Sequence, residues 1–363
     1  MSFSFTRRII SHLPRVFRRH TCSAIDTSIT ARTVAASATT SSDSSTSSAE
    51  IKGPRLTVGT GKNTQVFDRR LKRLQRDKSA ENFDAFDYLR NEVAYRLADR
   101  IYDVKKFSDL AVDFGCGNGL VAPHIFKENI GAFVQLDVSE KMIQKSKKSA
   151  EIPTISLVAD EEVAPAMFKN ESIDLALSCL SMHWINDLPG FFKRVYSALK
   201  PDGAFIGAMF GCNTLYELRC SLQLAEMERM GGVSSHISPF AETTDIGSLM
   251  NRAGFKMLTL DVDDICVKYS SIYKLMYDLQ GMAENSCSLH RSKHLNRDVL
   301  DAASAIYKAM YSEDEFVRAT FQVIYVIGWR PGPGTPQPAK RGSAQVSFKD
   351  IGGVAGSSSE TNN

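Results

Sequence analysis

The segment Val112-Asp113-Phe114-Gly115-Cys116-Gly117-Asn118-Gly119 carries the clearest information about the fold of this chain. A short apolar run ends in an acid and is followed at once by three glycines at alternate positions. Glycine tolerates positive φ and lets the backbone approach a ligand closely, so this pattern is typical of a strand that turns tightly beneath a nucleotide-like ligand. The dinucleotide pattern G-x-G-x-x-G is excluded, because Leu120 stands where the third glycine would fall.

Strand and helix patterns alternate along the chain from this stretch onward. Short apolar runs bounded by turn residues predict five strands, at 110–114, 132–137, 156–160, 173–178 and 204–210. Helices are predicted between them, from Gly119 towards Phe126, at 140–150 and at 191–199. The alternation predicts an α/β fold whose core is a doubly wound, Rossmann-like parallel sheet.

Helical patterns flank this core on both sides. A basic helix is predicted at 66–77, where it could contact anionic lipid headgroups or an acidic partner, or present a solvated face. The helix predicted at 88–102 repeats its apolar residues every four positions, and we expect that face to pack against the sheet edge. After the fifth strand we expect helices at 214–230, 243–252, 272–282 and 298–311, and strands at 255–269 and 321–329.

These patterns divide the chain into five predicted segments. Residues 1–50 are predicted to be a transit peptide and linker, 51–105 an N-terminal helical extension and 106–210 the Rossmann-like core. Residues 211–330 are predicted to form a helical insertion and the C-terminal strands of the sheet, and 331–363 a flexible tail.

The first segment has the composition of an organellar targeting sequence. It holds six arginines, no lysine and three acids, and it is dense in serine and threonine. This composition is typical of a mitochondrial transit peptide, with a disordered basic tail as the alternative. The remaining charges balance, which predicts no nucleic-acid partner, and no apolar run has the length of a membrane span. The scattered cysteines, without C-x-x-C, suit a reducing matrix compartment.

Acids stand at the ends of the first three predicted strands: Asp113, Asp137 and Asp160. Ligands of an open α/β sheet bind outside the carboxyl ends of its strands. There, Asp137 can accept hydrogen bonds from two ribose hydroxyls, and Asp160, with Glu161 beside it, from an adenine amine. A single acid of this kind is as often a helix cap, but three in register with the glycines predict an S-adenosyl-L-methionine site. Its predicted residues are Asp113, Gly115, Cys116, Gly117, Gly119, Asp137, Asp160 and Glu161.

Together with Leu199-Lys200-Pro201-Asp202-Gly203, these residues resemble the class I S-adenosyl-L-methionine-dependent methyltransferase superfamily, in which the first acid faces the ammonium group of the ligand. Further blocks resemble one branch of it, the mitochondrial complex I assembly factors that are methyltransferase-like in fold and act as protein arginine hydroxylases. The blocks are residues 67–73, 86–89, 180–189, 207–211, 214–219, 236–240, 278–282 and 341–348, so the likeness covers roughly residues 65–350.

This resemblance implies a mitochondrial protein on the matrix side of the inner membrane, in peripheral contact with it. It implies an assembly factor of complex I (NADH:ubiquinone oxidoreductase) that hydroxylates an arginine of the iron–sulfur subunit near the quinone site and works with other assembly factors. One alternative is an S-adenosyl-L-methionine-dependent methyltransferase acting on a protein or small-molecule acceptor. Another is a non-catalytic assembly chaperone that keeps the cofactor pocket only for stability.

Four residues are candidates for the reaction itself, with their roles left open. His183 and Trp184 follow the fourth strand, where this fold positions its acceptor, and Tyr216 and Glu217 lie in the helix predicted at 214–230. Glutamates of that helix suit a cationic guanidinium substrate, although surface glutamates are usually only solvated. No metal is predicted, because no histidine stands two residues before an acid, as the usual iron-binding pattern requires. The histidines considered are His124, His183, His236, His290 and His294.

Overall fold

The computed structural model describes residues 65–104, 106–292, 294–335 and 342. The predicted transit peptide and linker at 1–50 lie outside the described residues, as do residues 51–64 of the predicted helical extension. Most of the predicted tail also lies outside them, including the block at 341–348 apart from Gly342.

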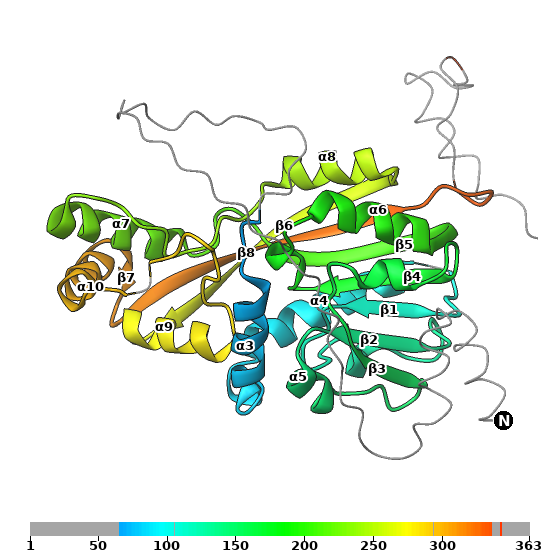
Figure 1. Ribbon diagram of the computed structural model, residues 1–363, viewed down its shortest axis with the longest axis horizontal. Helices are drawn as coiled ribbons and strands as arrows, with labels where there is room; N and C mark the ends of the chain where they lie inside the picture. The colour runs from blue at the N-terminus through cyan, green and yellow to red at the C-terminus, as the bar shows by residue number, and fades with distance from the viewer. Residues whose placement is uncertain (1–64, 105, 293, 336–341, 343–363) are drawn as a thin grey trace, which may run out of the picture.

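An eight-stranded sheet forms the centre of the molecule, with the order β3-β2-β1-β4-β5-β8-β6 and with β7 paired to the start of β8 (Figure 1). Strands β1 to β5 are parallel, β8 is antiparallel to β5, and β6 is antiparallel to β8. The predicted parallel core is therefore confirmed, with an antiparallel extension at one edge. The strands are β1 (Ala111–Phe114), β2 (Phe133–Asp137), β3 (Thr154–Val158), β4 (Ile173–Cys179), β5 (Leu199–Phe210), β6 (Lys256–Tyr269), β7 (Ser312–Glu313) and β8 (Phe316–Trp329).

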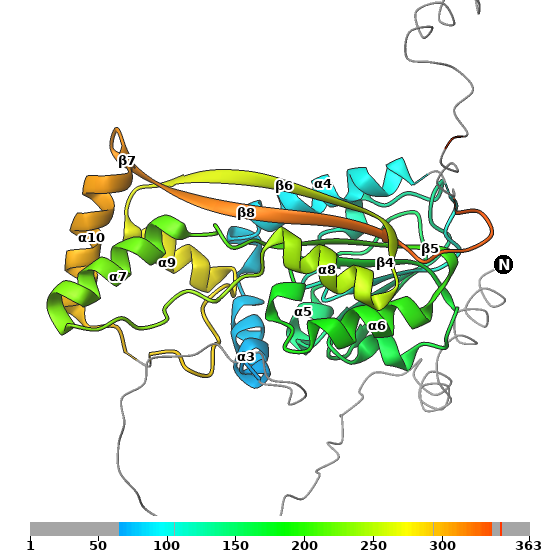
Figure 2. The same ribbon diagram turned by 90° about the horizontal axis from the view of Figure 1, so that it is seen from above.

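Helices cover both faces of the parallel strands, because successive side chains of a strand point to opposite faces (Figure 2). Ala111 of β1 belongs to the hydrophobic cluster on the side of α4, and its neighbour Val112 to the cluster on the side of α6 and α8. Met142 of α5 joins the α4 cluster. These helices are α4 (Tyr88–Asp103), α5 (Glu140–Gln144), α6 (Leu188–Ala198) and α8 (Thr243–Ala253).

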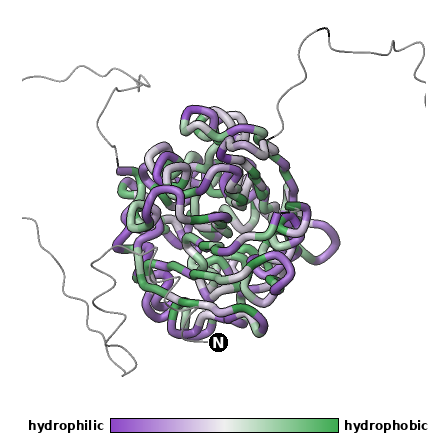
Figure 3. Tube along the Cα trace, turned by 90° about the vertical axis from the view of Figure 1, so that its right-hand side faces the viewer, coloured by the Kyte–Doolittle hydropathy of each residue, from purple (hydrophilic) through white to green (hydrophobic). Residues whose placement is uncertain are grey.

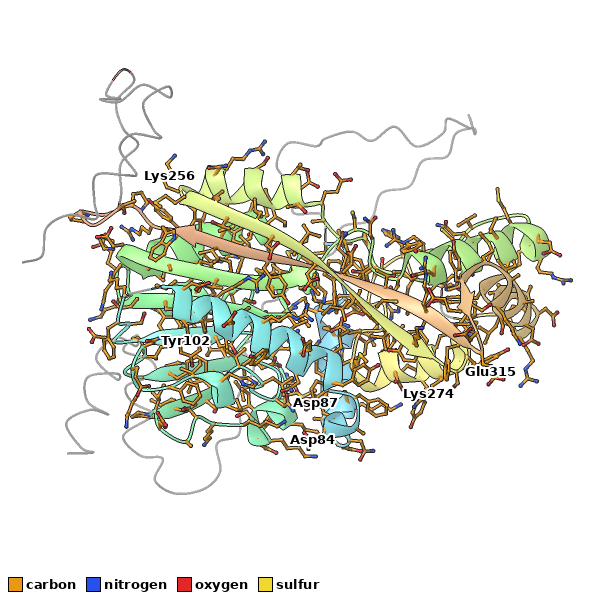
Figure 4. The ribbon with its side chains drawn as sticks, turned by 180° about the vertical axis from the view of Figure 1, so that it is seen from behind. Asp84, Asp87, Tyr102, Lys256, Lys274 and Glu315 are labelled. Atoms are coloured by element: carbon orange, nitrogen blue, oxygen red, sulfur yellow. The ribbon has the colours of Figure 1, made fainter. Side chains whose placement is uncertain are left out.

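The helix α4 packs over β4 and β5. Leu89, Val93, Leu97 and Ile101 are all buried, which confirms the apolar stripe that the sequence predicts. The expectation that this stripe packs at the sheet edge is wrong, because β8 and β6 continue the sheet beyond β5 and make β4 and β5 central strands. Figure 4 shows α4 crossing this face of the sheet, with Tyr102 near its end.

Strands β6 and β8 are longer than the parallel strands and extend beyond them as a two-stranded ribbon (Figures 1 and 2). Glu315 lies at the far tip of this ribbon (Figure 4). Three helices pack around the extension and correspond to the predicted helical insertion: α7 (Tyr216–Met230), α9 (Ile272–Gly281) and α10 (Arg297–Tyr311). The helix α3 (Arg69–Ser79) contacts both α9 and α5, and so lies between the insertion and the parallel core.

Two predicted helices are shorter than expected. The helix predicted from Gly119 towards Phe126 is replaced by turns and the 3-10 helix η2 (Ala122–His124), because Pro123 has no N–H and Ala122 N–H bonds the nearer carbonyl of Gly119. The helix predicted at 140–150 ends at Gln144, since Lys147 N–H donates to the carbonyl of Asn118 instead. The second change brings Lys147 against the glycine turn.

Short 3-10 helices join the remaining elements: η1 (Phe83–Ala85), η3 (Ala164–Met167) and η4 (Met182–Trp184). Figure 3, which looks along the sheet from one side, shows hydrophilic residues in many of the outer turns and hydrophobic segments within. In the part of the chain that the structure describes, no helix combines the length and the hydropathy needed to cross a membrane.

Candidate functional site

The glycine turn after β1 has the backbone conformation that its sequence predicts. Gly115, Gly117 and Gly119 have φ values of 80°, 59° and 76°, in the left-handed region that favours glycine. A Cβ on Gly115 would meet the Ser181 hydroxyl oxygen at 2.2 Å, whereas a Cβ on Gly117 would meet nothing within 4 Å. Cys116 between them is buried, and burial raises the pKa of its thiol. The turn therefore packs against the segment after β4 at its start and is open at Gly117.

Asp113, near the carboxyl end of β1, is a fully buried acid without a partner. Neither of its carboxylate oxygens has a hydrogen-bond partner. Burial, and to a lesser extent the nearby Asp137, raise the pKa of Asp113 to about 7. Burying an unpaired carboxylate is costly, and a ligand cation beside it would offset that cost. Asp113 therefore fits the ammonium group for which the sequence predicts it.

Asp137 ends β2 and is held by three donors. Its Oδ1 accepts from the Ser139 N–H at 2.8 Å, and its Oδ2 accepts from the Gly117 N–H at 3.0 Å and from Arg76 Nη1 at 3.2 Å. A carboxylate has about four lone-pair positions, so these donors occupy most of them. Two ribose hydroxyls can therefore donate to Asp137 only when Arg76 no longer donates to it.

Glu161 and Asp160 follow β3 and bind arginines of α3. Glu161 is fully buried, and its Oε1 accepts from Arg76 Nη1 at 3.0 Å and from the Ser181 hydroxyl at 2.9 Å, with Arg69 Nη2 at 2.9 Å. Burial alone would raise the pKa of Glu161, but the two arginines outweigh burial and lower it to about 2. Asp160 is more exposed and accepts from Arg69 Nη2 at 2.7 Å.

The basic helix α3 thus turns one charged face inward. Arg69, Lys72 and Arg76 lie three or four positions apart on one helix face and are largely or fully buried. The expectation of a lipid-facing or solvated basic surface is wrong for these three residues. Arg70 and Arg73 of the same helix are exposed, and for them contact with lipid or an acidic partner stays a prediction. The sequence analysis did not predict that these three residues point inward. Their spacing of three and four positions, which places them on one helix face, was the signal that could have indicated it.

The residues present fit S-adenosyl-L-methionine on three grounds. Asp113 is an unpaired buried carboxylate, Gly117 leaves open space beside a left-handed backbone, and Oε2 of Glu161 is buried without a hydrogen-bond partner. The one obstacle is Arg76, which bonds Asp137.

A second cluster of charged and aromatic side chains surrounds Glu284. Its Oε2 lies 3.2 Å from His183 Nε2 and accepts from Trp184 Nε1 at 3.1 Å, while its Oε1 pairs with Arg90. Burial alone would raise the pKa of Glu284, but Arg90 and His183 outweigh it and lower it to about 2. Glu284 is therefore ionised at neutral pH, and no pattern in the sequence singled it out.

The His183 ring is fixed from both sides. The Phe210 N–H donates to Nδ1 at 3.5 Å, so Nε2 carries the proton that faces Glu284. Burial lowers the pKa of His183 despite the opposing effect of Glu284. A neutral ring in a defined tautomer results, consistent with a positioning role.

Lys72 completes this cluster from α3. Its Nζ donates to the carbonyls of Ala283 at 2.8 Å and Asn285 at 3.0 Å, and lies 3.4 Å from the centre of the Trp184 ring. Burial lowers the pKa of Lys72 to about 7, although Glu284 opposes the shift. Groups with strongly shifted pKa values are common at functional sites, so this cluster is the candidate reaction centre.

Tyr216 and Glu217, the other two catalytic candidates, connect α7 to β8 instead. Glu217 is fully buried and accepts from the Thr320 hydroxyl at 2.6 Å and from the Thr320 N–H at 3.2 Å. The Tyr216 hydroxyl accepts from Arg318 Nη2 at 2.9 Å. The structure brings His183 and Trp184 together with Glu284 but gives Tyr216 and Glu217 separate partners, so their catalytic role stays a prediction without support from these contacts. Among the described residues, no group of three or more His, Cys, Asp or Glu side chains is arranged to hold a metal ion.

Comparisons with known proteins show which proteins this chain is similar to. The family model of the methyltransferase domain matches residues 112–207. The chain is 51% identical over 289 residues to the Danio rerio protein "Arginine-hydroxylase NDUFAF5, mitochondrial". These residues make up 79% of this chain and 89% of that protein. The identity of this chain to the Homo sapiens protein of the same name is 51% over 292 residues, 80% of this chain and 84% of that one.

More distant similarities also occur. The malonyl-[acyl-carrier protein] O-methyltransferase of Halorhodospira halophila is 30% identical over 282 residues, which are 76% of this chain and 92% of that one. Among solved structures, the YcgJ protein of Bacillus subtilis matches with a TM-score of 0.46 and 12% identity, covering 65% of this chain and 98% of that one.

Proposed function

The chain belongs to the family of mitochondrial arginine hydroxylases NDUFAF5, and we propose that it hydroxylates an arginine side chain of a complex I subunit during assembly of that enzyme. The proposed substrate is the iron–sulfur subunit near the quinone site, with other assembly factors as further partners. We propose that it acts on the matrix side of the inner membrane, in peripheral contact with it, after removal of an N-terminal transit peptide.

One observation carries the assignment of the active site. The segment after β4 joins two buried clusters, because Ser181 bonds Glu161 at 2.9 Å and His183 and Trp184 both contact Glu284. The first cluster contains the acids that are predicted to bind the cofactor. The second contains Lys72, His183 and Glu284, whose pKa values are shifted. Ligands of this sheet class bind at the carboxyl ends of the strands, where both clusters lie. The geometry therefore supports a cofactor site and a reaction centre side by side.

We propose S-adenosyl-L-methionine as the cofactor. Asp113 would hold its ammonium group, the glycine turn at 115–119 its amino-acid portion, Asp137 its ribose, and Asp160 with Glu161 its adenine. The bound cofactor would supply a positively charged sulfonium with an activated methyl group. Replacing Asp137 by Ala is expected to abolish binding of S-adenosyl-L-methionine in calorimetry, with Asp99→Ala on the exposed face of α4 as control. Equal affinity of D137A and natural protein contradicts this cofactor assignment.

Methyl transfer is the second candidate reaction, favoured by the methyltransferase-domain match and by the O-methyltransferase relative. Methyl transfer needs mainly alignment of the acceptor with the methyl group, so the lack of a marked general base does not argue against it. The third alternative, a chaperone without catalysis, would leave the cofactor pocket a purely stabilising role.

One experiment separates the three functions. Peptide mass analysis of the matrix-facing complex I subunits is compared between cells with and without this protein. Loss of one oxygen mass from an arginine is the expected result and supports hydroxylation. Loss of one methylene mass would support methyl transfer instead. Unchanged peptide masses in a poorly assembled complex would support the chaperone without catalysis.

A further inference from the structure

A cavity of about 350 Å³ lies between α7, α9, the segment at 236–240 and the residues 284–286, Ser292 and Leu295. About half of its lining is apolar, and the apolar walls come from both helices and the segment before α8. The main apolar wall residues are Leu215, Leu218, Leu222, Phe240, Met276 and Leu279. A cavity of this size, with apolar walls on part of its surface, accommodates a side chain that combines a hydrocarbon portion with a polar end.

Polar acceptors gather in the lining of the same cavity. Ser238 is 3% exposed, and its hydroxyl has no hydrogen-bond partner. The Asn285 Oδ1 atom is also buried without a partner. Glu284 lines the cavity too and is ionised, as shown above. Unsatisfied buried acceptors are costly, so this lining favours a guest that donates several hydrogen bonds.

Among its described residues, the cavity lining contains one acid, Glu284, and no lysine or arginine, which favours a cationic guest over an anionic one. Arg90 and Lys72, the cations near Glu284, do not belong to the cavity lining. Among the described residues of the lining, Glu284 and His236 are the titratable groups, and His236 Nε2 is paired with Glu226 at 2.7 Å. Glu284 also contacts His183 and Trp184, so the cavity adjoins the candidate reaction centre.

We propose that this cavity receives the side chain of the substrate arginine. Its methylene groups would pack against the apolar walls, and its guanidinium would donate to Glu284, Ser238 and Asn285. Arginine suits this site because it combines an apolar stem with five donors and is less strongly hydrated than an ammonium group. The identity of the guest rests on the proposed arginine hydroxylation, whereas the location of the site rests on the cavity alone.

Binding of a minimal probe to the full chain tests the proposal. The probe is Nα-acetyl-L-arginine methylamide, measured by NMR titration, and its neutral analogue carries citrulline in place of arginine. The natural protein is expected to bind the arginine probe at least tenfold more tightly, because charge-assisted hydrogen bonds depend on the cation. Equal binding of the two probes, or no saturable binding of either, overturns the proposal.

Variants of one helix locate the site. Leu222→Trp fills the cavity from α7 and is expected to abolish saturable binding of the arginine probe, while Leu224→Trp, on the exposed side of the same helix, leaves it unchanged. Ser238→Val provides a smaller second change, with an expected several-fold loss of affinity. Circular dichroism checks that each variant is folded. Unchanged binding in both folded cavity variants shows that the probe binds elsewhere.

The outcomes also separate this proposal from the proposed function. Loss of oxygen mass from a subunit arginine, together with unaltered probe binding in L222W and S238V, would retain hydroxylation and reject this cavity. Cavity-dependent, arginine-selective binding without any oxygen transfer would retain the site and reject hydroxylation.

Discussion

At the scale of single residues, Asp113 and Lys72 are buried groups whose pKa values move towards each other. Burial raises the pKa of the acid to about 7 and lowers the pKa of the base to about 7. Asp113 lies in the predicted cofactor site, and Lys72 beside Trp184 in the candidate reaction centre. Both groups therefore change charge near neutral pH, and each can be followed separately.

Asp113→Asn is expected to make the protein less sensitive to rising pH. Natural Asp113 keeps its proton up to about pH 7 when folded but loses it near its ordinary value of 3.8 when unfolded, so its contribution to the free energy of unfolding falls between these values. From pH 5 to pH 8 the variant should gain at most about 3 kcal/mol relative to the natural protein. Urea unfolding at both pH values measures this, with Asp99→Asn as control. A constant difference between D113N and natural protein contradicts the prediction.

Lys72 is expected to make the fluorescence of Trp184 depend on pH. The ammonium group lies 3.4 Å from the ring centre, and its charge interacts with the π electrons only below its pKa. In a Trp329→Phe background, emission should change with a midpoint near pH 7. Lys72→Met should remove this transition, and Lys78→Met, at the exposed end of α3, should keep it. A transition that persists in K72M would assign it to another group.

At the scale of elements, α3 connects the two clusters of the site. Arg76 reaches the cofactor acids, and Lys72 reaches the segment after α9. The start of the helix is held by Asn186, whose Oδ1 accepts from the N–H groups of Val66 and Phe67 at 2.8 Å each. A shift of α3 would therefore alter the cofactor site and the reaction centre together.

Arg76→Met is expected to increase the affinity for S-adenosyl-L-methionine severalfold, because Arg76 and a ribose compete for Asp137. The same change should lower the free energy of unfolding by about 3–5 kcal/mol, since it removes the cation that two buried carboxylates share. Calorimetry and urea unfolding measure the two effects, with Arg73→Met on the exposed face as control. Weaker binding in folded R76M would show instead that Arg76 helps to hold the cofactor.

At the scale of the whole molecule, the β6–β8 ribbon joins the helical insertion to the parallel core. Strand β8 pairs with β5 through its C-terminal half and with β6 along most of its length. One hydrophobic cluster includes residues of α4, β5, β8, α7, α9 and α10. The parallel core and the insertion therefore share buried surface, and we expect them to unfold together.

Phe321→Ala tests this shared core. Phe321 is buried in β8, and its ring centre lies 5.9 Å from that of Phe210 in β5. The substitution should lower the free energy of unfolding by about 3–5 kcal/mol in one transition, and Phe316→Ala, exposed at the far end of β8, by much less. Urea unfolding followed by circular dichroism and by tryptophan fluorescence measures this. Two separate transitions would show that the insertion unfolds on its own.

Prediction from sequence succeeded where the signal was local. The strands, the α4 stripe and the positive φ of the glycines follow from the spacing of neighbouring residues, and the structure confirms them. The helix expected after Gly119 failed because Pro123 and short-range hydrogen bonds favour turns, a competition that apolar periodicity does not register. The edge position expected for α4 failed because the order of strands depends on β8 and β6, far along the chain.

The turn beneath the predicted cofactor, the acids at the ends of the first three strands and the family of the chain could all be predicted from the sequence, because each rests on short motifs whose residues lie a few positions apart. The pairing of Arg69 and Arg76 with these acids, and the contacts of Glu284 with His183, Trp184 and Arg90, became visible in the folded chain and not in any motif. Lys72 and the Asn285 carbonyl that accepts its hydrogen bond are 213 positions apart. Such pairs form through the packing of α3 across the strand ends, which no local spacing encodes.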